Sequence, residues 1–210
     1  NFNIDTIFIG GGTPSILEPT QLEKILNTIN ICYNIGNESE ITMEVNPGEA
    51  PIYKLKEFKA LGINRISMGF QSLQPKLLKF LTRIHTNEQA IETYTNARDV
   101  GFENINIDMI FSIPNQTQQM LENDLLTLIK LAPNHISAYS LTVESGTELN
   151  RMVKKKTTIM PSDELDLNML LLTRDILIKN NYNPYEISNF SLTNNECKHN
   201  IHYWNSDRSE

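Results

Sequence analysis

A run of glycines at residues 10–12 is the feature of this 210-residue sequence best suited to holding a ligand. Because glycine has no Cβ, a ligand can approach the backbone closely, and the peptide groups can hydrogen-bond a carboxylate or an ammonium group. The run lacks the Gly-Lys-Ser/Thr of a nucleotide-binding P-loop. Pro14 and Ser15 break the pattern of a dinucleotide-binding fingerprint. The glycines therefore indicate a polar ligand without identifying it.

Polar side chains also end the apolar runs that follow. Glu44 and Asn46 end the second run, Gln71 and Ser72 the third, and Asp108 the fourth. In a parallel βα barrel the carboxyl ends of the strands share one mouth, where active sites are built. Strand ends also meet solvent, so a single polar residue there has an ordinary explanation. Repetition along the chain favours a built site.

Short apolar runs alternate with longer amphipathic ones, and this alternation is typical of βα units that form a parallel sheet. We expect strands at residues 6–9, 41–45, 65–70, 104–110 and 135–141, with a last strand at 185–188. We expect helices at 19–33, 51–61, 75–81, 87–100, 118–131 and 162–179, and a loop between 141 and 162. The series predicts a barrel or partial barrel with right-handed crossovers.

The composition is that of an ordinary globular protein, with 40% hydrophobic and 20% charged residues. A net charge of -7 argues against nucleic acid as a partner. No apolar run approaches the roughly 20 residues of a membrane span, so we expect a cytoplasmic protein. Cys32 and Cys197 stand too far apart to form a zinc site or a disulfide framework.

Several blocks of the sequence together resemble the radical S-adenosylmethionine (SAM) enzymes of the coproporphyrinogen dehydrogenase type. The blocks lie at residues 10–15, 42–48, 64–72, 81–85, 108–117 and 137–144. Their order and their spread over essentially the whole chain make the resemblance specific. It implies an α/β fold, a partial parallel (βα)6-type TIM barrel, with residues 1–182 as the radical SAM core and 183–210 as the start of a C-terminal extension.

The resemblance implies that S-adenosylmethionine lies across the barrel mouth. Gly11, Gly12 and Thr13 match the run that holds its methionyl part through backbone groups. Glu44 matches the carboxylate that helps to bind the ammonium group, and such a charge-assisted hydrogen bond is roughly twice as strong as a neutral one. Backbone near residues 138–142 is expected close to the adenine.

Three further residues match ligand-binding positions. Arg83 matches the guanidinium that pairs with the carboxylate of S-adenosylmethionine, a task suited to its planar fork. Gln71 and Asp108 match the groups that bind the ribose hydroxyls. Structural alternatives stay open for two of them, since Arg83 can pair with Glu88 on a surface helix and Asp108 can cap the turn before Pro114.

The motif His-Asn-x-x-Tyr-Trp at residues 199–204 resembles that of the HemW branch of this family. Proteins of that branch act as heme chaperones and have often been labelled oxygen-independent coproporphyrinogen oxidases. A neutral imidazole can bind heme iron, so His199 is the candidate heme ligand and His202 competes for the role. The alternative for Tyr203 and Trp204 is that they are packing anchors beneath a loop.

The cluster-binding loop of the family, Cys-x-x-x-Cys-x-x-Cys, does not occur in the sequence. In the family it precedes the glycine strand, which here would place it upstream of Asn1. Cys32 and Cys197 cannot replace three closely spaced thiolates. We therefore expect an internal fragment of a longer protein. On this view a [4Fe–4S] cluster belongs to the full-length protein only, and this chain by itself holds no metal.

Two functions follow from the resemblance, and whether the protein is an enzyme is left open. The first is a heme chaperone that binds heme and S-adenosylmethionine and passes heme to a hemoprotein. The alternative is an oxygen-independent coproporphyrinogen III oxidase, which oxidatively decarboxylates its substrate to protoporphyrinogen IX. The recipient hemoprotein and the electron donor are not identified, and any membrane contact is expected through the recipient. A barrel aldolase or isomerase is disfavoured because no Schiff-base lysine or metal triad ends a strand.

Overall fold

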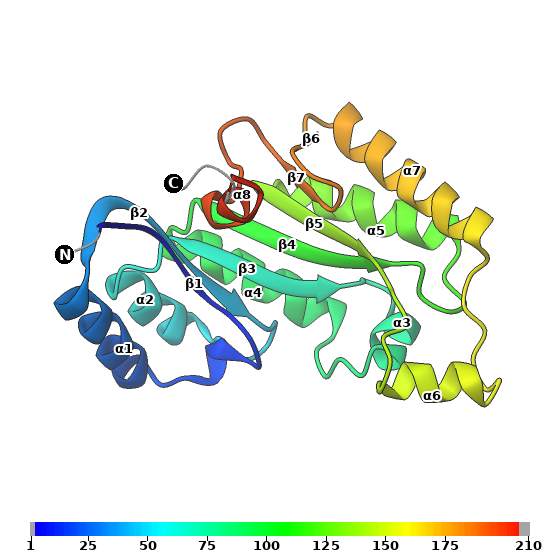
Figure 1. Ribbon diagram of the computed structural model, residues 1–210, viewed down its shortest axis with the longest axis horizontal. Coiled ribbons are helices and arrows are strands. Elements are labelled where there is room, and N and C mark those ends of the chain that lie inside the picture. The colour runs from blue at the N-terminus through cyan, green and yellow to red at the C-terminus, as the bar shows by residue number, and fades with distance from the viewer. Residues whose placement is uncertain (1–2, 206–210) are drawn as a thin grey trace.

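One mixed sheet organises the molecule, and the computed structural model describes residues 3–205 (Figure 1). The seven-stranded sheet has the order β1-β2-β3-β4-β5-β7-β6. Its strands are β1 (Asn3–Ile9), β2 (Asn34–Val45), β3 (Arg65–Gln71), β4 (Asn104–Phe111), β5 (His135–Ser140), β6 (Asn183–Pro184) and β7 (Asn189–Ser191). Strands β1 to β5 are parallel, and β7 joins the edge of β5 in the antiparallel sense.

Helices connect the strands as expected for βα units. They are a 3-10 turn η1 (Pro14–Ile16), α1 (Pro19–Cys32), α2 (Ile52–Ala60), α3 (Pro75–Phe80), α4 (Asn87–Val100), α5 (Gln118–Leu131), α6 (Glu148–Lys154), α7 (Asp163–Lys179) and α8 (Lys198–Asn205). The side chains of Thr86 and Thr117 accept hydrogen bonds from backbone N–H groups of the first turns of α4 and α5. These caps explain why both helices begin where the sequence predicts.

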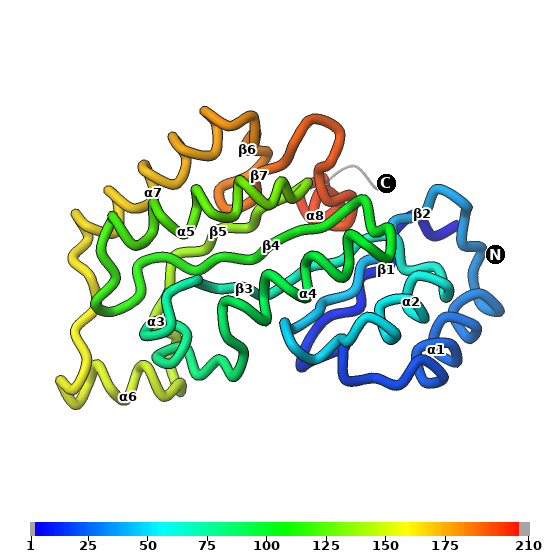
Figure 2. Tube along the Cα trace, turned by 180° about the vertical axis from the view of Figure 1, so that it is seen from behind, coloured from blue at the N-terminus to red at the C-terminus, as the bar shows by residue number. Residues whose placement is uncertain are grey.

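The two faces of the sheet differ in polarity because side chains alternate along each strand. In β3, Ile66, Met68 and Phe70 belong to the apolar core, whereas Arg65 and Ser67 line a cavity on the opposite face. Helices α2, α4 and α5 cover the apolar face, which Figure 2 shows from their side. Helix α8 lies on the other, concave face (Figure 1). The cavity lies on this concave face, and Asn200 of α8 contributes to its lining.

The predicted α/β partial barrel is confirmed, and α4 and α5 have the expected bounds. Strand β2 is longer than predicted, because Asn34 and Ile35 pair with β1 although their surroundings are polar. The expected loop at 141–162 contains α6. The predicted strand at 185–188 is wrong: this segment forms the bend between β6 and β7, which pair antiparallel.

The domain boundary at residue 182 stays a prediction. Residues 183–205 add β6, β7 and α8 to the sheet edge and its concave face, and residues 206–210 of the predicted extension lie outside the described part, as do residues 1–2 of the core. Between residues 3 and 205, the structure contains no helix with the length and apolar character that crossing a lipid bilayer requires.

Candidate functional site

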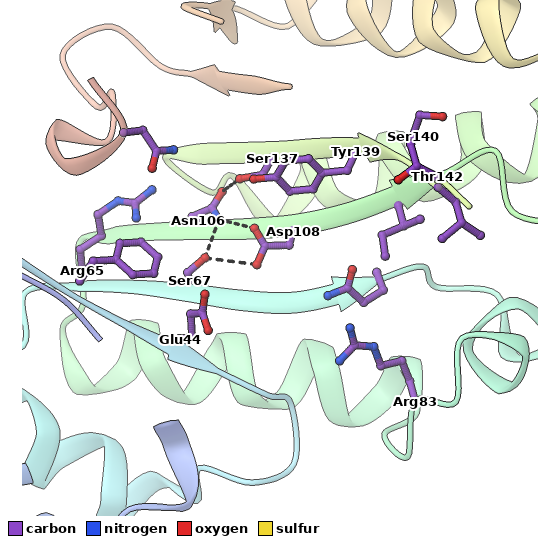
Figure 3. Close-up of a pocket in the computed structure, with 15 residues that line it drawn as sticks. Glu44, Arg65, Ser67, Arg83, Asn106, Asp108, Ser137, Tyr139, Ser140 and Thr142 are labelled. Carbon is purple, nitrogen blue, oxygen red and sulfur yellow. Dashed lines mark hydrogen bonds between the residues drawn. The ribbon is translucent and has the colours of Figure 1, made fainter. Parts of the chain in front are cut away.

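A cavity of about 400 Å³ occupies the concave face of the sheet (Figure 3). It is lined by Phe8, Glu44, Arg65, Ser67, Gln71, Arg83, Asn106, Asp108, Ile110, Ser137, Tyr139, Ser140, Leu141, Thr142 and Asn200. Arg65 lies where the strands begin, and Arg83 and Thr142 lie towards their carboxyl ends (Figure 3). The lining is mostly polar, as a site for a charged nucleoside requires.

A second cavity of about 210 Å³ adjoins the first and reaches the glycine run through Gly12. The two cavities share Glu44, Ser67, Gln71, Arg83 and Asp108. Four of the side chains that the sequence singled out for S-adenosylmethionine thus face one continuous space. Gly11 and Thr13 do not line either cavity but flank Gly12, and Thr13 Oγ1 accepts a hydrogen bond of 3.2 Å from Asn46.

The glycine run is held against the end of β2. The backbone N–H of Gly11 donates a hydrogen bond of 3.0 Å to Oε2 of Glu44. A Cβ on Gly10 would lie 2.9 Å from Oε1 of Glu44, so only glycine lets the carboxylate approach this closely. Gly11 and Gly12 have φ of 78° and 57°, and open space surrounds the positions where their Cβ atoms would stand. The loop therefore presents bare backbone to the cavity.

Gln71 ends β3 in an unusual backbone conformation. Its φ of 66° lies in the left-handed region, which costs a non-glycine residue energy. The residues that follow are fixed by the buried carboxylate of Asp124, which accepts hydrogen bonds from Ser72 Oγ (2.7 Å), Leu73 N (3.0 Å) and Gln74 Nε2 (2.6 Å). These hydrogen bonds hold the segment after Gln71 in place and so stabilise its strained conformation at the cavity. Strained residues held in this way are found at binding sites.

Asp108 lies in the middle of the concave face, in a hydrogen-bonded network drawn in Figure 3. Its carboxylate accepts hydrogen bonds from Ser67 Oγ (3.2 Å) and Asn106 Nδ2 (2.7 Å). Burial raises the pKa of this carboxyl, and the donors oppose that rise only in part. Asp108 does not cap the turn before Pro114, so that alternative is wrong.

Arg83 follows α3 in a turn and faces both cavities, half-buried. It is not on a helix, and within residues 3–205 it forms no ion pair with Glu88, so the surface-pair alternative is wrong. His85 supports the same turn, with Nε2 lying 3.3 Å from the carbonyl oxygen of Phe70. Burial lowers the pKa of His85, so the imidazole is neutral at pH 7.

Other polar residues within the strands, several of them near the strand starts, were not expected from the sequence. Ser67, Asn106, Ser137 and Tyr139 line the main cavity, as does Asn200 from α8. The signal was present in the sequence, because polar side chains alternate with apolar ones in Arg65–Gln71 and Asn104–Phe111. Such alternation indicates a sheet with a polar face of its own rather than one buried in apolar residues on both sides.

His199 lies on α8 against β1, next to the cavity but not in its lining. Its Nδ1 atom is 3.0 Å from Thr6 Oγ1, and its ring packs 5.3 Å from Phe8 and 5.5 Å from Tyr203. Burial lowers the pKa of His199, which keeps the imidazole neutral at pH 7. His202 is exposed and pairs with Asp5 at 2.9 Å. The two histidines therefore have different surroundings.

The exposed aromatic residues of α8 correct one alternative from the sequence. Tyr203 is 71% and Trp204 65% exposed, so they are not packing anchors beneath a loop. The Trp204 indole N–H donates a hydrogen bond of 2.9 Å to Glu186.

Cys32 is exposed and Cys197 buried, and residues 3–205 contain no group of His, Cys, Asp or Glu side chains able to hold a metal ion.

Similarity to known proteins decides the family. The sequence model of the Radical SAM superfamily matches residues 1–128. The chain belongs to the radical SAM superfamily. This superfamily in general uses S-adenosylmethionine with a [4Fe–4S] cluster, and the polar cavity with its bare glycine backbone fits the first of these groups.

Among curated radical SAM proteins, the chain is similar to the heme chaperone HemW of Lactococcus lactis, with 39% identity over 96% of this chain and 53% of that protein. It is 36% identical to the heme chaperone HemW of Bacillus subtilis, over 98% of this chain and 55% of that protein. The chain thus spans about half the length of these relatives.

The radical SAM fold is also found in a solved relative. Coproporphyrinogen III oxidase (HemN) from Escherichia coli superimposes with a TM-score of 0.81 at 24% identity, over 92% of this chain and 44% of that one. At this level of identity the likeness concerns the fold alone. It supports the partial barrel and its radical SAM topology.

Proposed function

We propose that this chain is the S-adenosylmethionine-binding part of a heme chaperone of the HemW type. One observation carries the heme part of the proposal: His199 is neutral, half-buried and oriented through Nδ1, and the next residue, Asn200, lines the main cavity. Heme iron binds a neutral imidazole nitrogen, and a hydrogen bond at one ring nitrogen fixes the other as the ligand atom. The similarity to the HemW proteins supports the same function.

S-adenosylmethionine would be held by both cavities together. Glu44 would accept hydrogen bonds from its ammonium group, beside bare backbone at Gly11 and Gly12. Arg83 would pair with its carboxylate, and Gln71 and Asp108 would accept hydrogen bonds from the ribose hydroxyls. When bound, this cofactor supplies one-electron radical chemistry, whereas the protein supplies its placement. The side chains of Ser67 and Asn106 hold Asp108 in position for that contact.

A [4Fe–4S] cluster does not fit the residues of this chain, which contains only Cys32 and Cys197. Cys197 is buried, and its thiol donates a hydrogen bond of 3.4 Å to Glu40, while Cys32 is exposed at the end of α1. The two cysteines therefore do not form a common metal-binding site.

Heme titration of the intact protein tests the proposal. We expect His199→Ala to weaken heme binding at least tenfold, which is about 1.4 kcal/mol, and to change the Soret absorbance of the complex. His202→Ala is the matched control, because its ring is exposed and bound to Asp5, and we expect it to retain heme binding. Unchanged affinity and spectrum in His199→Ala would remove the histidine from the function.

An oxygen-independent coproporphyrinogen III oxidase is the second candidate. It would use the same contacts to S-adenosylmethionine, so the cavity suits either function. Anaerobic turnover of coproporphyrinogen III by the intact, reconstituted protein would favour the oxidase. Heme binding without such turnover would favour the chaperone. The recipient hemoprotein of a chaperone would be found among proteins that acquire heme in its presence.

A further inference from the structure

Arg65 is a buried guanidinium with no partner of its own. It is the first residue of β3, is 2% exposed, and points into the main cavity (Figure 3). Its Nε atom has no hydrogen-bond partner, and its guanidinium forms no ion pair with any residue from 3 to 205. A buried charge without a paired group strongly disfavours the folded state. The question is therefore which group, from the protein or from a ligand, pairs with this charge.

The nearby carboxylates are engaged with other groups. Glu40 of β2 accepts hydrogen bonds from the thiol of Cys197 and from the backbone N–H groups of Lys198 and His199. Asp108 of β4 accepts from the side chains of Ser67 and Asn106, as described above. Arg65 influences Asp108 only through its charge, by which it lowers the pKa that burial raises.

The uncharged groups around Arg65 do not pair with it either. Both ring nitrogens of His135 are used, Nδ1 by Asn106 at 2.6 Å and Nε2 by Tyr185 at 2.7 Å. Burial and the charge of Arg65 hold the pKa of His135 well below its usual value, so this imidazole is neutral. The two ring nitrogens of His135 thus have other partners, and the guanidinium of Arg65 faces the cavity.

Arg65 and Arg83 lie at opposite ends of the same cavity. Arg65 begins β3 and Gln71 ends it, so the two ends of the strand are about 20 Å apart at about 3.3 Å per residue. Gln71 and Arg83 line both cavities. S-adenosylmethionine has one carboxylate, and the proposed function assigns it to Arg83. The anion that Arg65 requires must therefore come from a second ligand.

We propose that Arg65 binds a side-chain carboxylate of a tetrapyrrole at the inner end of the cavity. The proposal rests on the proposed function, since heme carries propionate carboxylates at its edge. A planar carboxylate with a single charge matches one guanidinium fork. The cavity lining contains no lysine and no histidine, so it lacks the additional cations that a doubly charged phosphate favours. Asn200 also lines the cavity, and it is the neighbour of His199 on α8.

Heme and its dimethyl ester distinguish this contact in the intact wild-type protein. We expect heme, with free carboxylates, to bind about tenfold more tightly than the ester in which both propionates are methylated. Arg65→Met keeps the length of the side chain and removes its charge, so we expect the variant to bind the two compounds equally. Arg174→Met is the matched control, because Arg174 is exposed on α7, and should keep the wild-type preference.

Two measurements without heme separate binding from folding. Because Arg65 has no partner, we expect Arg65→Met to unfold at a higher temperature than the wild type in the absence of ligands. We also expect its affinity for S-adenosylmethionine to stay within about twofold, whereas Arg83→Met should weaken that affinity. A lower unfolding temperature for Arg65→Met, or a tenfold loss of S-adenosylmethionine affinity, would contradict the proposal.

The experiments distinguish a failure of the Arg65 contact from a failure of the proposed chaperone function. If the wild type binds heme and its ester equally, the carboxylate contact is wrong and the chaperone function stands. The same holds if Arg65→Met keeps the preference for heme. If the wild type binds neither compound, the proposed function itself fails and the contact falls with it. The wild-type comparison needs no variant, so it decides the question even if Arg65→Met does not fold.

Discussion

The backbone N–H of Gly11 donates a 3.0 Å hydrogen bond to the carboxylate of Glu44, which joins the loop after the first strand to the end of the second. The contact needs the close approach that Gly10 permits, because a Cβ there would lie 2.9 Å from Glu44 Oε1. The glycine run and the carboxylate therefore form one structural unit. Small changes in the glycine run will therefore move the carboxylate of Glu44. They will also disturb the proposed binding of the methionyl end of S-adenosylmethionine.

Gly10→Ala tests this unit. We expect about a tenfold loss of affinity for S-adenosylmethionine, about 1.4 kcal/mol, because the added methyl group displaces Glu44. Calorimetric titration measures the loss. Gly36→Ala is the matched control, since a Cβ on Gly36 meets nothing nearer than Ser39 Oγ at 3.6 Å. Equal affinities for the two variants would contradict the role of Gly10.

Gln71 gives a prediction about strain. At a φ of 66°, alanine keeps the steric cost of the left-handed region and glycine removes it. We expect Gln71→Gly to be about 1 kcal/mol more stable than Gln71→Ala, while both lose the ribose contact and bind S-adenosylmethionine more weakly than the wild type. Urea unfolding and ligand titration measure the two effects. Greater stability of the alanine variant would show that the conformation is relaxed.

Asp108 gives a prediction about pH. Because burial raises its pKa, the folded protein keeps this proton at pH values where the unfolded chain has lost it. The free energy of unfolding contributed by Asp108 therefore falls as the pH rises from about 4 through the raised pKa. Asp108→Asn should remove this part of the pH dependence, and Asp124, whose pKa is also raised, should leave a remainder of the same sign.

Urea denaturation across the acidic range measures the effect of Asp108. The expected result is a shallower decrease of unfolding free energy with rising pH in Asp108→Asn than in the wild type. Identical slopes would mean that the Asp108 carboxyl titrates alike in the folded and unfolded chains.

Glu40 gives a prediction about the helix that carries His199. Its buried carboxylate accepts hydrogen bonds from the first backbone N–H groups of α8, where a negative charge is favourable. We expect Glu40→Gln to cost about 1–2 kcal/mol and to speed hydrogen exchange in residues 198–205. Glu38→Gln is the control, because Glu38 is exposed and only its backbone oxygen contacts Lys198. Unchanged exchange in Glu40→Gln would show that α8 does not depend on this cap.

Local patterns were enough to place most elements. The caps at Thr86 and Thr117 and the apolar spacing after them fix α4 and α5, and these helices have the predicted bounds. The positions of Glu44 and Gln71 near strand ends were also readable, because parallel strands must bring their carboxyl ends to one edge. Asp108, expected at the end of its strand, lies within β4, which continues to Phe111. These features depend on neighbours in sequence.

Pairing partners decided what the patterns left open. The polar start of β2 is a strand only because β1 lies beside it, and residues 185–188 are a bend because β6 and β7 pair on either side. The sequence by itself determined the resemblance to the radical SAM enzymes and the order of the βα units. The tertiary structure alone decided that Arg65 is buried without a partner and that His199 lies beside the cavity, because both depend on contacts between segments far apart in the chain.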